Sequence, residues 1–364
     1  MAVACGEFHS VCLDHATASM WVMGSDRNLQ LGLRTMGDRK RPVNLSLQNV
    51  REISCGADFT TCLDINGVVW TFGKVNDLGI GRSSGRANAN IPKQISSVPR
   101  IISVQCGSSF TMLIDEEHSL WSFGDNTSGQ LGTGDNITYL TPRLVPNSRY
   151  QSISCGTDHS VAIDPEGNAF SCGNNTYGKL GLGHERNTNE FSPIIGLTSA
   201  AKAASCGKYH SVVLMDTGDL YAIGSNANAQ LGVAGKNAQN VPIQVPNLPP
   251  ISQVSCGERN TKCVDTDGNL WVFGCNRSGS LGLGEESPII SPTKHSQFDN
   301  VTVLSKGCYN HSIIKDSTGI WVCGGNRYGE LGLGHSTTVR SFVRLPDMFS
   351  CILSNPMRAK SARK

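Results

Sequence analysis

Short apolar segments of strand length recur along the whole chain and alternate with polar, glycine-containing turns. In one stretch they run Val50–Cys55, Thr60–Asp64, Val68–Phe72 and Ile91–Ile95. Most of these segments are rich in β-branched or aromatic residues, which favour strands. The group of four recurs at intervals of about 50 residues, which is the signature of a repeat architecture.

Four features mark each repeat. An apolar strand ends in a Cys-Gly step at Cys5, Cys55, Cys106, Cys155, Cys206 and Cys256, and the step is inverted as Gly307-Cys308 in the seventh copy. Three residues after the glycine stand His9, Phe59, Phe110, His159, His210, Asn260 and His311, each followed by Ser or Thr. An aromatic column and a closing Leu-Gly step follow, the aromatic positions being Trp21, Trp70, Trp121, Phe170, Tyr221, Trp271 and Trp321.

Seven such units, starting near residues 1, 51, 102, 151, 202, 252 and 303, predict an all-β fold, a seven-bladed β-propeller with four-stranded antiparallel blades. One blade cannot bury its two faces alone, so we expect the aromatic column to pack each sheet against the next. Closing the ring removes long open strand edges.

Both chain ends compete for one position in the ring. Residues 1–5 supply the first strand, and residues 349–353 fall where an eighth such strand would begin. Either 349–353 closes the ring beside the first blade, or it leaves the ring and leads into the tail. We therefore divide the chain into a propeller, 1–353, and a basic tail, 354–364, expected to be disordered and to contain Arg358, Lys360, Arg363 and Lys364.

The combination Cys-Gly-x-x-His-Ser, aromatic-x-Phe-Gly and Gly-x-Leu-Gly resembles the regulator of chromosome condensation repeat, over residues 1 to about 346. The resemblance implies a propeller in which both termini share one blade, which favours ring closure by 349–353. It also implies that acidic and histidine residues in the Cys-Gly-x-x-His loops can act on a Ran-like small GTPase, and Asp158-His159 and Glu7-Phe8-His9 match that pattern.

Composition narrows the class of protein. The formal net charge is +2, and without the four tail cations the chain has 27 basic against 29 acidic residues, so the body lacks the basic excess of a nucleic-acid-binding domain. No apolar run is long enough to span a membrane and no signal peptide is evident, so we expect an intracellular protein, cytoplasmic or nuclear. Its fourteen cysteines are then expected to be buried thiols.

Two polar columns have structural explanations. His9, His159, His210 and His311 belong to four different repeats, unlike the closely spaced ligands of structural zinc sites, so we expect packing or strand-end hydrogen bonds and no metal or other cofactor. Six aspartates precede the turn before the aromatic strand and are expected to cap its backbone; they are Asp14, Asp64, Asp115, Asp164, Asp265 and Asp316.

The two residues between the Cys-Gly glycine and the histidine column vary while their surroundings repeat. Side chains from such positions should converge on one face near the axis. A partner-binding face and a merely solvated ring of loops fit equally well. The candidate contact residues are Glu7, Asp58, Ser109, Asp158, Lys208, Tyr209, Glu258, Arg259 and Tyr309.

The second repeat departs from the others. Its Leu-Gly step comes two residues early, and a polar stretch, Arg82–Asn90, follows. Repeat drift explains this stretch better than a dedicated binding loop, since surface loops tolerate such changes.

No catalytic motif accompanies the repeats, so we do not expect covalent catalysis. The favoured function is a non-enzymatic scaffold that binds a partner protein through loops on one face. The first alternative is a guanine-nucleotide exchange factor for a Ran-like GTPase, although no repeat carries a large insertion. The second alternative is a cytoskeletal, microtubule-associated protein, and the tail is expected to make weak contacts with polyanions. A light sensor is disfavoured, because all five tryptophans occupy the aromatic column.

Overall fold

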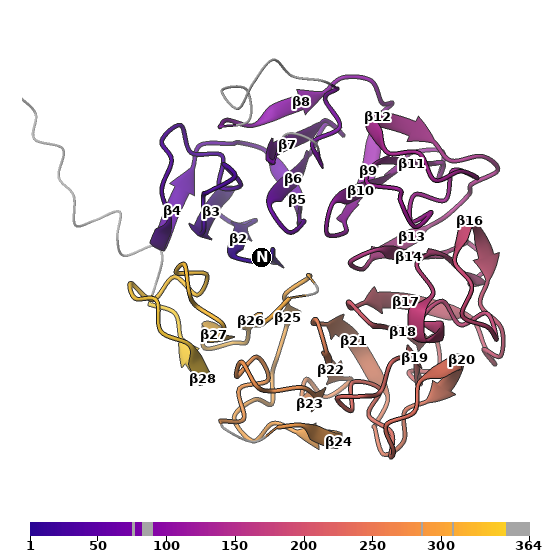
Figure 1. Cartoon of the computed structure of the whole chain (residues 1–364). Helices are drawn as coiled ribbons and strands as arrows, with labels where there is room; N and C mark the ends of the chain where they lie inside the picture. Colours follow the sequence, from indigo (N-terminus) through magenta and orange to yellow (C-terminus); the bar gives the residue numbers. More distant parts are fainter. Residues whose placement is uncertain (75–76, 82–89, 285–286, 308, 347–364) are drawn as a thin grey trace, which may run out of the picture.

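A computed structural model describes the whole chain except residues 75–76, 82–89, 285–286, 308 and 347–364. Its strands form seven four-stranded antiparallel sheets arranged as blades around a central axis (Figure 1). Each sheet uses four consecutive strands of one repeat, so the predicted seven-bladed propeller is confirmed. The expected segment Val50–Cys55 is strand β5 as predicted, whereas the fourth segment shortens to Lys93–Ile95.

The first three blades, from the axis outward, contain β1 (Ala2–Cys5), β2 (His9–Asp14), β3 (Ser19–Gly24) and β4 (Arg39–Leu45); β5 (Val50–Cys55), β6 (Phe59–Asp64), β7 (Val69–Gly73) and β8 (Lys93–Ile95); and β9 (Ile101–Cys106), β10 (Phe110–Asp115), β11 (Leu120–Gly124) and β12 (Tyr139–Leu144). The fourth and fifth contain β13 (Ser152–Cys155), β14 (His159–Ile163), β15 (Ala169–Gly173) and β16 (Thr188–Pro193), with a short 3-10 helix, η3 (Thr176–Gly178); and β17 (Ala201–Cys206), β18 (His210–Met215), β19 (Leu220–Gly224) and β20 (Gln239–Gln244). The last two contain β21 (Ile251–Cys256), β22 (Asn260–Asp265), β23 (Leu270–Gly274) and β24 (Ile289–Lys294); and β25 (Val303–Leu304), β26 (His311–Lys315), β27 (Ile320–Gly324) and β28 (Val339–Arg344).

The aromatic column packs each blade against the preceding one, as expected. Trp70 lies against the cluster of Val22 and Leu31 from the first blade, and Trp271 lies against that of Val212 and Leu231 from the fifth. These apolar interfaces between sheets form the core. Burying one large apolar side chain completely stabilises the fold by about 1.5–3 kcal/mol.

The first and seventh blades meet directly. Trp21 packs in one cluster with Ile313 and Val322 of the seventh blade. The Cys5 amide donates to the Lys306 carbonyl at 2.8 Å, and the Lys306 amide donates to the Val3 carbonyl at 3.1 Å. Residues 349–353 lie outside the described residues, so their part in ring closure stays a prediction.

The histidine column links neighbouring blades. The Nε2 atoms of His9, His159, His210 and His311 lie 2.7 to 3.0 Å from a hydroxyl of the next blade, His210 for example from Thr261. Thr261 donates in turn to the Gln230 carbonyl at 2.8 Å. Because that hydroxyl proton is used, Nε2–H of the histidine is the donor. The expected strand-end hydrogen bond is therefore present.

The glycine of the Cys-Gly step leaves space for the imidazole ring of the column histidine. A Cβ at Gly207 would lie 2.5 Å from Cε1 of His210. The aspartate column also behaves as expected, since Asp265 accepts the amides of Asp267 and Asn269 at 3.0 and 2.8 Å. Of the twelve cysteines in the described part of the chain, all are free thiols and only Cys275 is not buried.

Burial keeps the column histidines neutral. It lowers the pKa of His210 to about 3 and that of His159 to about 4. The unfolded chain, with a histidine pKa near 6.5, therefore binds these protons first. The stability that the neutral histidines contribute is fully present above about pH 6.5, and it is lost progressively as the pH falls below that value.

We predict that His210→Asn reduces this acid sensitivity, because Asn260 occupies the same column without a titrating ring. Below pH 6.5 the free energy of unfolding of the variant should fall less steeply than that of the wild type, by up to about 1.4 kcal/mol per pH unit. Urea unfolding between pH 7 and pH 5 measures the slope. Thr261→Val, which removes the hydroxyl but no titrating group, should lower stability with the slope unchanged, and equal slopes in wild type and His210→Asn would refute the assignment.

Candidate functional site

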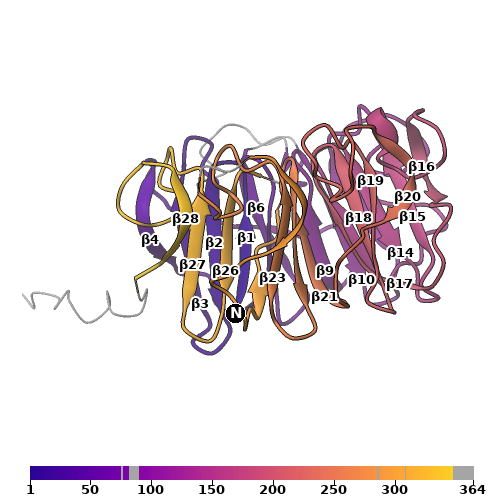
Figure 2. The same ribbon diagram turned by 90° about the horizontal axis from the view of Figure 1, so that it is seen from below.

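The loops that follow the inner strands and those that precede the outer strands lie on one face. In each blade the residue after the aromatic-strand glycine donates its amide to the loop carbonyl just before the histidine column, as Asn174 does to Asp158 at 2.9 Å and Ser225 to Tyr209 at 2.9 Å. We call this the loop face. It faces the viewer in Figure 1 and lies at the top of Figure 2, opposite the N-terminus.

The loops also contact one another around the axis. The Glu7 amide donates to the Ala57 carbonyl at 3.2 Å, and the Ala57 amide donates to the Ser108 carbonyl at 2.9 Å. Tyr309 packs against Ala57, and each is only 8% exposed. Tyr309 therefore presents little surface to a partner, whereas Ser109 is half-buried in its loop.

Four of the candidate residues form one cluster, which we call the axial cluster: Lys208, Tyr209, Glu258 and Arg259. The Lys208 ammonium lies 3.1 Å from a Glu258 carboxylate oxygen, and the Arg259 guanidinium lies 3.7 Å from the same oxygen. Arg259 also lies over the Tyr209 ring, with Cζ 5.1 Å from the centroid. The exposed Tyr177 of η3 forms a T-shaped pair with that ring, with the two centroids 6.2 Å apart.

Electrostatics hold this cluster in its charged form. Burial alone would raise the pKa of Glu258, but hydrogen bonds from Asn310 and Lys208 outweigh it and lower that pKa. The Asn310 amide lies 2.6 Å from Glu258 Oε2. Burial alone would lower the pKa of Lys208, and Glu258 instead raises it. The result is a pre-ordered cation–carboxylate–aromatic surface, a composition typical of interaction hot spots.

Asp158 is held by a lysine that sequence analysis did not single out. Lys179 is 2% exposed, and its ammonium lies 2.6 Å from Asp158 Oδ1 and 3.2 Å from the Lys208 carbonyl. Burial would raise the pKa of Asp158, but His159 and Lys179 together lower it. Lys179 stands where Gln30, Gln130 and Gln230 precede the Leu-Gly step in other repeats, and that departure was the available signal.

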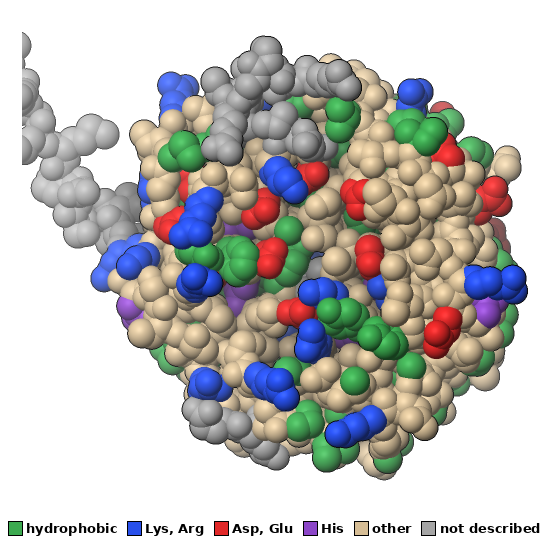
Figure 3. Space-filling model, in the orientation of Figure 1, with side chains coloured by type: hydrophobic (Ala, Val, Ile, Leu, Met, Phe, Trp, Pro, Cys, Tyr) green, Lys and Arg blue, Asp and Glu red, His purple; other side chains and the backbone are tan. Residues whose placement is uncertain are grey.

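Acidic residues gather on the other side of the axis. Burial and then Asp58 raise the pKa of Glu7, while burial raises the pKa of Asp77 to about 6 despite Lys74, 3.5 Å away. Asp58 and Asp125 add to that increase. The face therefore carries both signs of charge, unevenly distributed, as Figure 3 shows.

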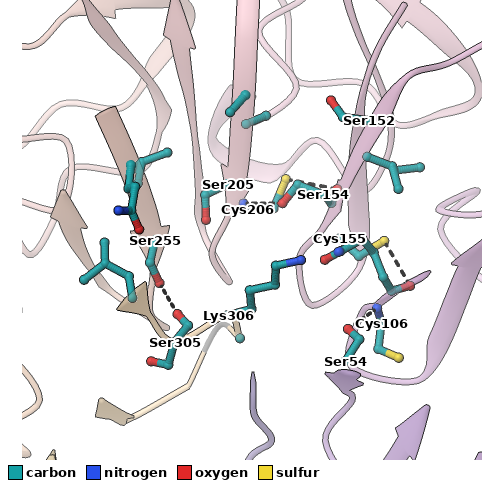
Figure 4. A pocket seen from close by; sticks show the side chains of 18 of the residues that line it. Ser54, Cys106, Ser152, Ser154, Cys155, Ser205, Cys206, Ser255, Ser305 and Lys306 are labelled. Atoms are coloured by element: carbon teal, nitrogen blue, oxygen red, sulfur yellow. Dashed lines mark hydrogen bonds between the residues drawn. The ribbon is translucent and has the colours of Figure 1, made fainter. Parts of the chain in front are cut away.

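A central channel of about 400 Å³ runs behind the loops, lined by inner-strand residues (Figure 4). Three of its serines bridge neighbouring blades: Ser54, Ser154 and Ser205 accept amides of the next blade at 2.9 to 3.0 Å. Lys306 enters the channel and pairs with Glu52 at 3.2 Å. Blade packing thus accounts for these three serines. In the part of the chain described, no three His, Cys, Asp or Glu residues gather as a metal site.

Two predicted regions lie outside the described residues: most of the Arg82–Asn90 stretch and the tail with Arg358, Lys360, Arg363 and Lys364. Among the residues described, no helix is long and apolar enough to cross a membrane.

We predict that Lys179→Gln raises the pKa of Asp158, because the buried ammonium that favours the carboxylate is lost. A titration of the Asp158 carboxyl by carbon-13 NMR measures the change. Lys208→Gln should leave the Asp158 titration nearly unchanged, since only the backbone carbonyl of Lys208 meets Lys179. An unchanged pKa of Asp158 in Lys179→Gln would show that the ion pair does not lower that pKa.

The chain matches two family models: one described as RCC1-like domain over residues 1–249, and one described as regulator of chromosome condensation (RCC1) repeat over residues 267–313. The ultraviolet-B receptor UVR8 of Arabidopsis thaliana is 28% identical over 252 residues, which cover 66% of this chain and 56% of the receptor. Human protein RCC2 is 31% identical over 173 residues, 40% of this chain and 33% of that protein. The chain thus spans between a third and just over half of these curated relatives.

A solved structure shares the fold over nearly the whole chain. Prp20p from Saccharomyces cerevisiae superposes with a TM-score of 0.81 at 20% identity, covering 96% of this chain and 88% of that one. The published description of that structure concerns binding of Prp20p to Gsp1p and histones. At this level of identity the likeness establishes the fold alone.

Proposed function

Because the chain belongs to the regulator of chromosome condensation family, we propose that it is a non-enzymatic interaction propeller that binds a partner protein through the loop face. The axial cluster is the observation that supports the proposal most. Tyr209 is flanked by two cations, Lys208 at 5.3 Å and Arg259 at 5.1 Å from its ring centroid. Tyr and Arg held rigidly near the centre of an interface are the residue types that contribute most to binding.

The frame beneath the cluster suits this role. The loops are short and mounted on four-stranded sheets, and the loop of Glu258 is joined to the next one by a backbone hydrogen bond to the Tyr309 carbonyl at 3.4 Å. A surface that is already ordered loses little conformational entropy when a partner binds. We also propose that the protein binds its partner inside the cell, in the cytoplasm or the nucleus.

Exchange-factor activity is the second candidate. Binding of Prp20p to Gsp1p and Asp158 in the fourth loop favour it. An exchange factor stabilises the nucleotide-free GTPase by differential binding and needs no covalent chemistry. Lys179 would keep the Asp158 carboxylate charged and in a fixed position for such a contact.

We predict that Tyr209→Ala combined with Arg259→Ala weakens partner binding by at least about 2 kcal/mol, roughly 30-fold in Kd, with little loss of stability. The partner is captured from the native cell with the tagged chain, identified by mass spectrometry and titrated against each variant. Asp216→Ala combined with Asp267→Ala is the matched control, because both residues lie in exposed turns of the same two blades on the opposite face. Unchanged affinity in the first variant together with a loss in the control would place the site on the opposite face.

We predict that Asp158→Asn separates the two candidates. If the chain is an exchange factor, the variant should lose most nucleotide release from a Ran-like GTPase while keeping much of its affinity. Release of a fluorescent guanine nucleotide, measured by stopped flow with wild type and variant, tests this. A wild-type chain that does not accelerate release would exclude exchange activity on that GTPase and leave the scaffold.

A further inference from the structure

Arginines occupy one loop position on three consecutive blades. The position follows the buried Asp26 or Asn that opens each loop before the outer strand, and it is Arg27, Arg277 and Arg327 in the first, sixth and seventh blades. In the third, fourth and fifth blades the same position is uncharged, as Thr127, Thr176 and Ala227. Because the seventh blade joins the first, the three arginines are neighbours around the ring. All three are exposed.

A second position adds two cations at the same seams between blades. A Cβ at Gly279 would lie 2.5 Å from the Arg340 Cα, and one at Gly329 would lie 2.5 Å from the Lys40 Cα. Arg340 therefore lies beside the loop of Arg277, and its Nη1 donates to the Arg277 carbonyl at 2.8 Å. Asn189 and Asn240 fill this position at two other seams. We call Arg27, Lys40, Arg277, Arg327 and Arg340 the basic arc.

Part of the basic arc is held in place by Tyr328. The Arg27 guanidinium lies over the tyrosine ring, with Cζ 4.3 Å from the centroid, and its Nη1 lies 3.1 Å from the hydroxyl. Arg327 lies 5.5 Å from the same centroid. Phe8 supports the ring edge-on at 5.1 Å. A stacked guanidinium is pre-oriented and keeps further N–H groups for a planar anion.

Four cations of the arc have no ion-pair partner among the residues that the structure describes. Within the described part of the chain, no carboxylate lies within ion-pair distance of Arg27, Lys40, Arg277 or Arg327. Figure 3 shows Lys and Arg side chains recurring over the blades of β24, β28 and β4 on this face. Unpaired cations clustered on a rigid frame attract anionic ligands.

We propose that the basic arc binds an acidic peptide segment of the partner protein, a proposal that rests on the loop face being the partner site. Carboxylates match stacked guanidinium groups by bidentate hydrogen bonds. A nucleic acid fits less well, because its continuous phosphate backbone would meet Glu7, Asp58 and Asp125 farther round the same face. The arc covers three of seven blades, which suits a short acidic segment beside the axial cluster.

The test uses a fluorescein-labelled peptide of ten glutamates, titrated with the full chain by fluorescence anisotropy at low and moderate salt. Arg277→Gln combined with Arg327→Gln should weaken binding about tenfold and reduce its salt dependence, since two charge-assisted contacts are lost. Arg186→Gln combined with Lys236→Gln removes the same charge from exposed positions of the same face on the fourth and fifth blades, and should change the affinity less than twofold. An equal loss of peptide affinity in both double variants, or no loss in Arg277→Gln with Arg327→Gln, would overturn the proposal that the basic arc binds the peptide.

An oligothymidylate of twelve nucleotides tests whether the arc prefers a nucleic acid to an acidic peptide. Tighter binding of this probe than of the peptide at equal ionic strength, lost in Arg277→Gln with Arg327→Gln, would replace the acidic peptide by a nucleic acid. Tyr209→Ala with Arg259→Ala should retain peptide binding. The captured partner could bind both double variants with the affinity it has for the wild type, while the peptide still binds the arc. That result would contradict the proposed function and leave the arc as an acidic-peptide site. The two failures are therefore distinguishable.

Discussion

Hydrogen bonds between the second strands of neighbouring blades fix how each sheet of the propeller packs against the next. Hydroxyls such as Thr60, Ser211 and Thr261 donate to a carbonyl of the preceding blade, and where the preceding blade has a column histidine they also accept from it. The groups are fully buried, so leaving one unpaired would cost about 1–3 kcal/mol. The angle and spacing between neighbouring blades are thereby restricted, which fits the seven sheets into one ring.

A rigid frame allows the loops to vary without loss of the fold. The side chains of the axial cluster and the basic arc stand at repeated backbone positions, so each substitution changes the surface and leaves the sheet intact. This explains how a propeller with a net charge close to zero can present separate acidic and basic regions on one face. Attraction of a partner then depends on where the charges lie more than on their sum.

Some side chains depart from the repeat inside the protein. Lys262 is 2% exposed in a column that elsewhere holds Val11, Met112 or Ile313, and burial lowers the pKa of its ammonium. Its Nζ lies 3.3 Å from the Asn260 amide oxygen. Lys179 departs from the repeat at another position, the one before the Leu-Gly step, and meets Asp158, 2.6 Å away, at the edge of the loop face. The two lysines therefore differ both in their place in the repeat and in their neighbour, which is a carboxylate for Lys179 and an amide oxygen for Lys262.

The number of blades, the strand content, the packing role of the tryptophan column and the set of variable loop positions could be predicted from the sequence, because periodic burial and turn chemistry are local properties that recur in every repeat. The repeats also placed Lys208, Tyr209, Glu258 and Arg259 on adjacent blades but did not show that they touch. The contact of Tyr309 with Ala57 and the ion pair of Asp158 with Lys179 became visible in the folded chain alone. These contacts join residues that closure of the ring and the curvature of each loop bring within a few ångströms, and no spacing along the chain encodes that distance.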